Sequence, residues 1–418
     1  MADDKVAETK GSFDSDVVIV GGGLNGLSMA LALRSGGFQV TLIDALDPTT
    51  ALDAGFDGRV FAIAFASCRM FAALGLWDEL KSDAQPINDI MVTDGTVRGG
   101  ASPLFLHFDH KEIGDEPLGH LMESRHMRAV LTQAVQGDDG IDFRAPAKVT
   151  DQKADAYGFT VTLDDGTRVR SKLALASDGR NSRLRDWAGI KTVGWDYDQV
   201  GIVATVEHEE EHEGVAQEFF LPGGPFAILP MTGKRASLVW TEKTRTAEAL
   251  LGLSRERLLE ELRQRFGDYL GAIDIAGPVW SYPLDLVLAR TYVSDRMALI
   301  GDAAHGIHPI AGQGLNLGLR DVAVMAEVLT DAVRLGEDIG SGFVLERYEQ
   351  WRRLDNVASS LAMDALNRLF SNDIAPVRLA RDIGLAAVNN LPPLRRFFMR
   401  QAGGDAGNLP RLLRGEGL

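Results

Sequence analysis

The chain has little of several features that mark other classes of protein. Its 418 residues include a single cysteine, Cys68, so no disulfide can form within the chain. Basic residues are also scarce: 43 Lys and Arg stand against 59 Asp and Glu, which gives a net charge of −16. Because a nucleic-acid backbone attracts a basic surface, this balance argues against nucleic acid as a partner.

Long apolar runs are missing as well. No stretch approaches the roughly 18 apolar residues of a membrane span, and the first residues, "MADDKVAETKGSFDSD", lack the basic and apolar regions of a signal peptide. We therefore expect a cytoplasmic protein whose contact with a membrane is at most peripheral, on the inner face. What is present is ample apolar material, because 45% of the residues are hydrophobic and can bury a sizeable core.

Residues 16–44, "DVVIVGGGLNGLSMALALRSGGFQVTLID", predict a strand, a glycine turn, a helix and a second strand, which is the start of a parallel α/β sheet. Gly21, Gly23 and Gly26 fit G-x-G-x-x-G, whose glycines allow a tight bend, the approach of a pyrophosphate and close packing of the helix. Asp44 ends the second strand and is placed to bind a ribose. This order of strand, glycine turn, helix, strand and acidic residue predicts a dinucleotide site, for either NAD or FAD.

A second glycine-rich loop, "GDAAHGIHPIAGQGLNLGLRD", covers residues 301–321. Asp302 follows a predicted buried strand, at the end where open α/β sheets bind ligands, and can hold the ribityl hydroxyls of a flavin. Gly312 and Gly314 open a predicted helix whose N-terminus can stabilise negative charge on a reduced flavin. FAD is long enough to be gripped at both ends, so two such loops favour FAD.

At these residues the chain resembles the group A flavoprotein monooxygenases, whose fold is that of 4-hydroxybenzoate hydroxylase, and more narrowly the ubiquinone-biosynthesis hydroxylases. The family signature H-P-[LIV]-[AG]-G-Q-G-x-N-x-G-x-x-D is met at every position from His308 to Asp321. An Asp-Gly pair after a strand, Asp178-Gly179, is the family's third motif. The resemblance implies a Rossmann-like FAD-binding domain interrupted by a smaller β-sheet substrate domain, with C-terminal helices.

The same resemblance implies roles for individual residues. Arg59 and Arg125 are similar to arginines that contact the flavin or its pyrophosphate, and Asp302 is similar to the acid that binds the ribityl chain. The alternative for the two arginines is a purely structural ion pair on the surface. Six residues are expected to line the flavin ring: Pro309, Gly312, Gln313, Gly314, Leu315 and Asn316. No protein residue is assigned a catalytic role, because the flavin carries the chemistry.

The implied reaction is hydroxylation of an aromatic ring. NAD(P)H or a protein electron donor would reduce FAD, O2 would add to it, and the hydroperoxide would transfer oxygen to a prenylated phenol or benzoquinone precursor of ubiquinone. Other ubiquinone-biosynthesis proteins and further copies of the chain are the partners that the family implies. Two alternatives are an FAD-dependent oxidoreductase that inserts no oxygen into a prenyl lipid, and a non-catalytic prenyl-lipid carrier.

The expected domains follow from this resemblance. Residues 1–84, 120–195 and 285–340 would form the FAD-binding domain, residues 85–119 and 196–284 the substrate domain, and residues 341–418 the C-terminal helical region. The segment "QEFFLPGGPFAILP" would lie over the flavin, either as substrate wall or as core strand. The residues of it that we expect to contact substrate are Phe220, Phe226, Leu229 and Pro230.

Histidines offer two other interpretations. His208 and His212 satisfy the zinc-protease pattern H-E-x-x-H, but both flanks are strand-like, so we interpret the run as a solvated hairpin end and expect no metal site. His305 and His308 flank the second glycine loop; ring packing or a hydrogen bond to the loop is favoured over a metal or acid–base pair.

The C-terminus differs in charge from the rest of the chain. Residues 376–418 hold seven arginines and three acidic residues, a net charge of +4. In "LPPLRRFFMRQ", Phe397, Phe398 and Met399 lie among arginines, as in a helix that rests on an anionic membrane. The alternative is a helix packed on the body of the protein.

Overall fold

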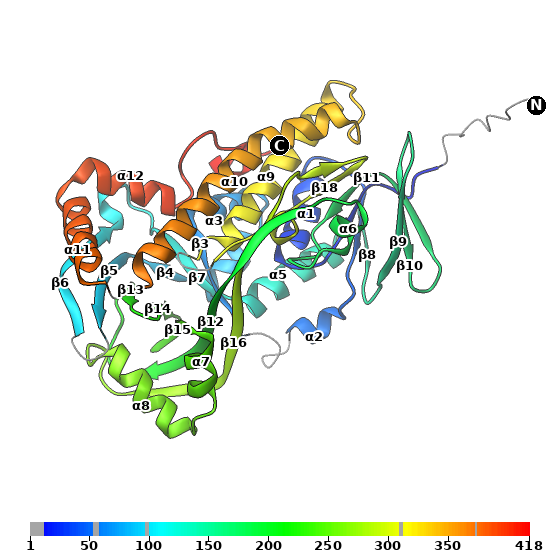
Figure 1. Ribbon diagram of the computed structural model, residues 1–418. Helices are drawn as coiled ribbons and strands as arrows, with labels where there is room; N and C mark the ends of the chain where they lie inside the picture. Colours follow the sequence, from blue (N-terminus) through cyan, green and yellow to red (C-terminus); the bar gives the residue numbers. More distant parts are fainter. Residues whose placement is uncertain (1–11, 53–57, 97–99, 309–311, 373) are drawn as a thin grey trace, which may run out of the picture.

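The fold combines three β-sheets with a helical C-terminal segment, as seen in a computed structural model that describes residues 12–52, 58–96, 100–308, 312–372 and 374–418 (Figure 1). The first sheet has the order β17-β18-β11-β1-β2-β8, with β9 and β10 attached to β11. Its strands are β1 (Ser15–Val20), β2 (Val40–Ile43), β8 (Ile141–Arg144), β9 (Val149–Ala154), β10 (Phe159–Leu163), β11 (Arg168–Ala176), β17 (Val293–Ser294) and β18 (Met297–Leu299).

The central strands of this first sheet are parallel, and β1 pairs with both β2 and β11. Their residues are nearly all buried, as expected where helices cover both faces. The helices around it are α1 (Leu24–Ser35), α2 (Pro48–Leu52), α5 (Ser124–Gln136), α6 (Arg183–Trp187) and α9 (Gly314–Arg334). The predicted strand–turn–helix–strand unit is therefore confirmed, as is the helix that begins at Gly314.

The second sheet is mostly antiparallel and has the order β19-β16-β12-β15-β14-β13-β5-β6. Two long strands, β12 (Thr192–His208) and β16 (Ile273–Ala289), run as one ribbon from the first sheet to the far end of the second (Figure 1). The other strands are β5 (Asp89–Thr96), β6 (Gly100–Asp109), β13 (Val215–Leu221), β14 (Gly224–Met231), β15 (Arg235–Lys243) and β19 (His305–Gly306); α7 (Thr244–Leu251) and α8 (Arg255–Phe266) cover its outer face.

A third, small sheet of β3 (Val60–Ala64), β7 (Gly119–Glu123) and β4 (Gln85–Ile87) lies between the other two. Short helical segments follow: α3 (Phe65–Ala73), α4 (Trp77–Leu80), η1 (Lys81–Asp83), η2 (His110–Glu112) and η3 (Gly301–Ala303). The chain ends in α10 (Gly342–Phe370), α11 (Ala375–Asn390), α12 (Pro392–Ala402) and η4 (Arg411–Arg414). The predicted fold class, an interrupted α/β flavin domain with a β-sheet domain and C-terminal helices, is confirmed.

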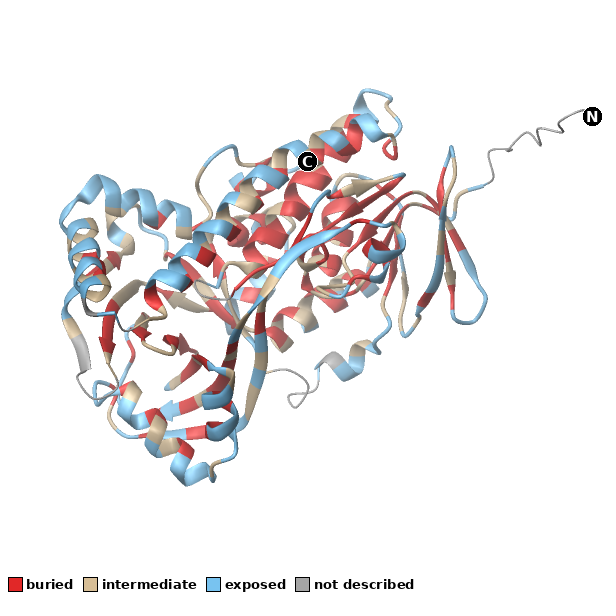
Figure 2. Cartoon of the chain, viewed as in Figure 1, coloured by how far each residue is buried: buried red, intermediate tan, exposed pale blue. Residues whose placement is uncertain are grey.

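Burial separates the centre of the molecule from its C-terminal helices. Helix α9 is buried along most of its length, whereas few of the described residues of α11 and α12 are buried (Figure 2). The largest apolar core joins the first sheet to α1, α5 and α9. The two glycine loops therefore begin at the most deeply packed part of the fold.

The acidic run at residues 207–214 corrects a prediction. It was expected to be a hairpin end, but β12 and β13, the strands that it connects, are not paired with each other. His208 and His212 are buried, and His212 Nε2 lies 2.8 Å from the carbonyl oxygen of Met231. His212 thus ties the run to the end of β14, whereas His208 Nδ1 lies 2.8 Å from the carbonyl oxygen of Glu210, within the run.

Candidate functional site

The first glycine turn joins β1 to α1, and its three glycines differ in what surrounds them. Gly21 has φ +108°, and a Cβ built on it would lie 2.2 Å from the Ser177 carbonyl oxygen. A Cβ on Gly26 would lie 1.8 Å from the Gly21 carbonyl oxygen, whereas one on Gly23 would meet no atom within 4 Å. The fold itself requires Gly21 and Gly26, and Gly23 leaves the backbone open to a bound group such as a pyrophosphate.

Asp44 closes the end of β2 and contacts the turn. Its Oδ2 accepts from the Gly22 amide at 2.5 Å and its Oδ1 from the Leu46 amide at 2.8 Å. A small hollow beside it is also lined by Arg128 and Thr132 of α5. This position fits the predicted ribose contact. Arg128 was missed in the sequence, although it lies one helical turn after the predicted Arg125.

Arg59 and Arg125 lie together, where β3 and β7 pair. The Ser124 amide donates to the Arg59 carbonyl oxygen at 2.9 Å. Arg59 is exposed, with its guanidinium 5.9 Å from the ring centre of Tyr282 on β16. Arg125 Nε donates to Glu123 at 2.8 Å, so Arg125 forms an ion pair, as the alternative structural interpretation predicts. A contact of either arginine with the cofactor stays a prediction.

The Asp178-Gly179 pair follows β11, beside the first turn. Asp178 Oδ2 accepts from the Arg183 amide at 2.8 Å and so caps α6. Burial raises the pKa of Asp178 against the opposing effect of these hydrogen bonds. Gly179 has φ +83°. The next residue, Arg180, pairs with Asp285 of β16, so the motif also ties the first sheet to the second.

The two glycine-rich loops meet at Asn25, the residue just before Gly26. A Cβ on Gly301 would lie 2.3 Å from Asn25 Nδ2, and one on Gly318 would lie 2.4 Å from the same atom. The Asn25 amide is thus enclosed between the second loop and α9. Asp302 lies in η3, half-buried, and among the described residues no hydrogen bond or ion pair reaches its carboxylate. One ligand can therefore contact both loops, as the sequence predicts for FAD.

Asn316 fastens the N-terminus of α9 to β3. Its Oδ1 accepts from the Ala64 amide at 2.9 Å and from Ser67 Oγ at 3.0 Å, and its Nδ2 donates to the Ala62 carbonyl oxygen at 2.8 Å. All of these partners belong to the protein, so the Asn316 side chain positions the loop, and any contact with a flavin would come from its backbone.

The other predicted flavin-ring residues surround this helix N-terminus. A Cβ on Gly312, at φ +62°, would lie 3.4 Å from the Cβ of Ala62. Gln313 donates to the Ala402 carbonyl oxygen at 3.2 Å, Gly314 is the first residue of α9, and Leu315 is buried. Pro309 lies outside the described residues. The first-turn amides of α9 give this point a positive field suited to an anionic ring.

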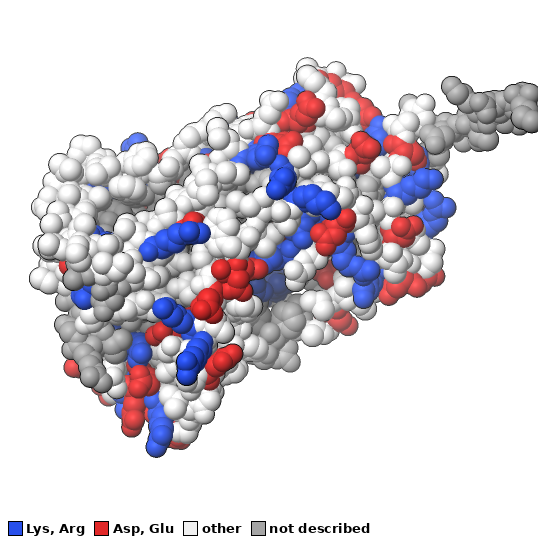
Figure 3. Space-filling model, in the orientation of Figure 1, with Lys and Arg blue, Asp and Glu red and all other residues white. Residues whose placement is uncertain are grey.

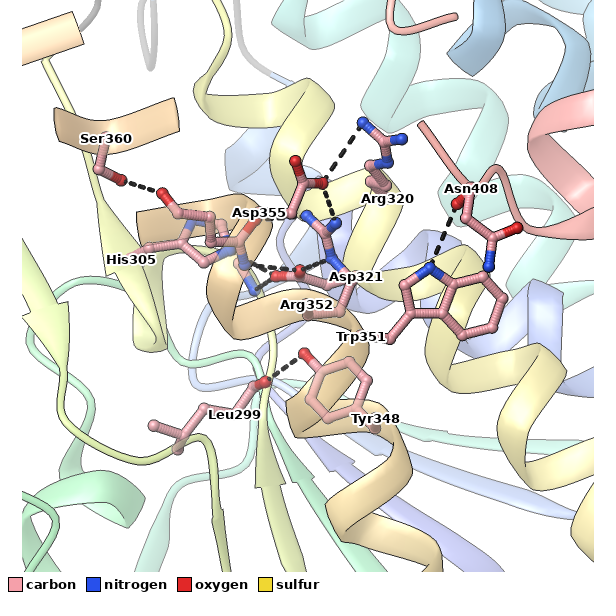
Figure 4. A network of polar contacts seen from close by, with 12 residues as sticks. Leu299, His305, Arg320, Asp321, Tyr348, Trp351, Arg352, Asp355, Ser360 and Asn408 are labelled. Atoms are coloured by element: carbon pink, nitrogen blue, oxygen red, sulfur yellow. Dashed lines mark hydrogen bonds and ion pairs between the residues drawn. The ribbon is translucent and has the colours of Figure 1, made fainter. Parts of the chain in front are cut away.

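A buried ion network holds the second loop from behind, and Figure 4 shows it converging on Asp321. Asp321 accepts from the Gly301 amide at 3.0 Å and from Arg352 Nε at 2.7 Å, and its Oδ2 lies 2.5 Å from His305 Nε2. Burial alone would raise the pKa of Asp321, but His305 and Arg352 hold it well below its usual range. Asn356 completes the network at 3.0 Å.

The remaining histidines have structural surroundings. His305 has the hydrogen bond just described, and His308 packs edge-on against Tyr197, with ring centres 5.1 Å apart. Burial lowers the pKa of His308 to about 4, so the ring is neutral at pH 7. The favoured interpretation of ring packing and hydrogen bonding agrees with this geometry. Among the described residues, no group of three or more His, Cys, Asp or Glu is arranged to hold a metal ion.

The four residues predicted to contact substrate do not all point to the same face of the second sheet. Leu229 faces β3, in a cluster that includes Ala62. Phe226 points to the opposite, outer face, where it is fully buried and packs against Trp240 under α7 and α8. Pro230 follows Leu229 and shares the side of Phe226. The substrate prediction is thus corrected for Phe226 and Pro230, because the pleat turns them away from the flavin domain.

We call the side of the second sheet that carries Leu229 the inner face. On β13 it carries Phe220, which stacks on Phe370 of α10 with ring centres 3.8 Å apart. Register places these residues on it: Ile90, Val92 and Asp94 of β5, Ala216, Glu218 and Phe220 of β13, and Ala227, Leu229 and Met231 of β14. The inner face meets β3 at one end and the C-terminal helices at the other.

Comparison with known proteins agrees with this geometry. Residues 14–359 match the family described as "FAD binding domain". The chain belongs to this family. It is 50% identical to the ubiquinone hydroxylase UbiL of Rhodospirillum rubrum, over 96% of this chain and 93% of the relative. It is 33% identical to the 3-demethoxyubiquinol 3-hydroxylase of Escherichia coli, over 93% of this chain and 98% of that one.

A solved structure shares the fold. The p-nitrophenol 4-monooxygenase of Pseudomonas putida superimposes with a TM-score of 0.79, at 20% identity, over 94% of this chain and 99% of its own. The prediction of an FAD-dependent monooxygenase, a hydroxylase of ubiquinone biosynthesis, is confirmed by the named relatives. Gly23, with open space above it, the half-buried Asp302 and the N-terminus of α9 all fit FAD.

Proposed function

We propose that the protein hydroxylates the aromatic ring of a prenylated phenol or benzoquinone precursor of ubiquinone. The observation that carries the proposal is the position of the α9 N-terminus. It is hydrogen-bonded to β3, and β3 in turn packs against the apolar inner face of the second sheet. FAD, when bound, supplies the activation of O2 and the oxygen transfer, with electrons from NAD(P)H or a protein donor. The names of the relatives support the class of substrate.

The residues of the chain have three tasks in this reaction. The first turn holds the adenosine half of FAD through backbone amides and Asp44. The amides at the start of α9 stabilise negative charge on the flavin ring, and the network behind Gly301 keeps them in place. Leu229 and its neighbours on the inner face exclude water from an aromatic substrate.

Oxygen-18 labelling tests the reaction class. The holoenzyme is supplied with reductant, a short-chain 2-prenylphenol and 18O2, and the product is analysed by mass spectrometry. The proposal predicts one labelled oxygen atom per hydroxylated ring. Oxidation or reduction of the substrate without label would instead establish the alternative of an FAD-dependent oxidoreductase, and a protein that purifies folded but without flavin would favour the lipid carrier.

We further propose that the C-terminal helices rest on a membrane and admit the prenyl tail. Phe397 and Phe398 are 53% and 41% exposed, whereas Met399 is buried, so α12 packs through one side and presents the other. Further exposed apolar residues are Leu361, Leu369, Leu379, Ile383 and Leu394 on α10, α11 and α12, and Leu391 between α11 and α12. On the face seen in Figure 3, this end of the molecule shows few charged side chains. Among the described residues, no helix is long and apolar enough to cross a bilayer.

Flotation with liposomes that contain anionic lipid tests this contact. The double change Phe397→Ser and Phe398→Ser is expected to lower the bound fraction several-fold without loss of stability, because both rings are exposed. The matched control, Phe343→Ser, alters a 67% exposed ring at the start of α10 and should bind as the parent does. Equal binding by the double variant and its parent would contradict the proposal.

A further inference from the structure

One acidic side chain on the inner face, Glu218, has no polar partner among the described residues. Glu218 lies in β13, opposite Ala227 of β14 and Val92 of β5. Among the described residues, no hydrogen bond or ion pair reaches its carboxylate. The side chain nevertheless keeps partial solvent access, so its oxygen atoms border accessible space.

Its surroundings are apolar on both sides along the strand. Ala216, two residues before it, belongs to the cluster that joins Leu229 to Ala62 of β3. Phe220, two residues after it, belongs to the cluster that joins β6 to Phe370 of α10. Glu218 thus lies between the flavin-side contact of the inner face and the helices that we propose for the prenyl tail.

Several charged groups on the elements packed around Glu218 form ion pairs with one another. On β5, Asp94 forms a fully buried ion pair with Arg381 of α11, at 2.6 Å. The other pairs join Asp364 to Arg368 on α10 and Glu123 of β7 to Arg235 of β15, and α11 also carries Arg378 and Asp382. Burial raises the pKa of Glu218 to about 8. An unpaired acid costs stability, so its presence here points to a ligand.

We propose that the Glu218 carboxylate binds the ring hydroxyl of the aromatic substrate and accepts its proton. This rests on the proposed function. The O–H bond of the phenol breaks, an O–H bond forms on Glu218, and the electron pair stays on the phenolate oxygen, which enriches the ring carbons that receive oxygen from O2. When the hydroxylated carbon gives its hydrogen as a proton to water, the C–H electron pair restores the aromatic ring, and Glu218 returns the stored proton to the ring oxygen.

The acidity of the two groups suits such a transfer. A phenol has a pKa of about 10 and an ordinary Glu a pKa of about 4.3, so an exposed carboxylate would be a poor base for it. Because the pKa of Glu218 is raised to about 8, the difference shrinks to about 2 units. The apolar inner face thus makes a carboxylate into a base matched to a phenol.

Binding to the oxidised holoenzyme tests the contact without turnover. We would titrate 2-geranylphenol and its methyl ether, read the perturbation of the flavin spectrum, and compare about pH 6 with about pH 9. The parent should prefer the phenol about tenfold at the higher pH and less at the lower, because the ionised carboxylate makes the stronger hydrogen bond. Glu218→Gln should lose this pH dependence, and Glu218→Asp should keep part of it.

Turnover and stability give two further readouts. General base catalysis contributes about 10²-fold or more, so kcat of Glu218→Gln should fall by about that factor and lose its rise with pH. Because the pKa is raised in the folded state, the folded parent binds a proton that the unfolded chain has lost, and its stability falls as the pH rises from about 4.3 to about 8 and then levels off. Glu218→Gln should therefore melt at a higher temperature than the parent at about pH 9 and show little difference at about pH 5.

A control variant and three named outcomes decide the role of Glu218. Glu248→Gln, on an exposed turn of α7, should match the parent in every readout. An unchanged phenol preference and unchanged pH profile in Glu218→Gln, or a lower melting temperature at alkaline pH, would overturn the proposal. If the parent binds the phenol but inserts no labelled oxygen, the proposed function fails, and the binding comparison still decides the role of Glu218.

Discussion

The two loops that would hold FAD keep their shapes by different means. The first turn is set by backbone packing, since Gly21 and Gly26 lie against carbonyl oxygens with no room for a Cβ. The second loop is set by buried side chains, Asn316 and Asp321, whose partners lie as far away as Arg352. The difference teaches that a local motif suffices where sterics decide, whereas a charged network needs the whole fold.

Asp321→Ala should give the largest effect, because it removes the centre of the network. Arg352 would lose its fully buried partner and keep only the ion pair with the partly exposed Asp355, and we expect a loss of about 3–5 kcal/mol in the free energy of unfolding, with weakened FAD binding. Chemical denaturation measures the first and flavin fluorescence the second. Asp331→Ala on the same helix, where the carboxylate is half exposed, should cost less than about 1 kcal/mol.

Asp321 should also make the stability of the protein depend on pH. Its pKa is depressed in the folded state, so it adds stability above the unfolded value of about 3.9 and loses that contribution as the pH falls toward the folded value. Asp321→Asn should therefore lose less stability than the parent between about pH 6 and about pH 3. Parallel acid denaturation curves for the two proteins would contradict this account of the network.

Asn316→Ala tests the side-chain clamp of the second loop at lower cost. The Ala64 amide would lose its acceptor in a buried position, and we expect a loss of about 1–3 kcal/mol together with a weaker grip on FAD. Thermal denaturation with and without added FAD measures both. Full parental stability would show that the clamp does not hold the loop.

A pair of glycine variants separates folding from binding in the first turn. Gly26→Ala forces the helix away from the Gly21 carbonyl oxygen and should cost about 1–3 kcal/mol. Gly23→Ala meets no protein atom, so its apoprotein should be as stable as that of the parent, while its affinity for FAD falls. Equal FAD affinity in Gly23→Ala and the parent would mean that no phosphate approaches this backbone.

Asp44→Asn should have only a small effect on stability. The side chain is half-buried, and the amide keeps one acceptor oxygen for the turn, so we expect a change of less than about 1 kcal/mol. The affinity for FAD should fall about tenfold if the carboxylate binds the ribose. Calorimetric titration of the apoprotein with FAD measures this affinity.

Much of this site could be predicted from the sequence, because its motifs are contiguous. The first turn, Asp44 and the start of α9 at Gly314 all follow from spacing along one short stretch. The Asp321 network could not be foreseen, since Arg352 belongs to another helix. The sides of Phe226 and Glu218 depended on the register of β13 and β14, and one residue of slip reverses the pleat.

The visible absorption spectrum of the purified protein is the most direct test of the central claim that the two loops hold one FAD. It should show bound flavin, and under anaerobic conditions NADH or NADPH should bleach that flavin faster when a prenylphenol is present. A folded protein with no flavin spectrum, which also fails to take up added FAD, would contradict the account.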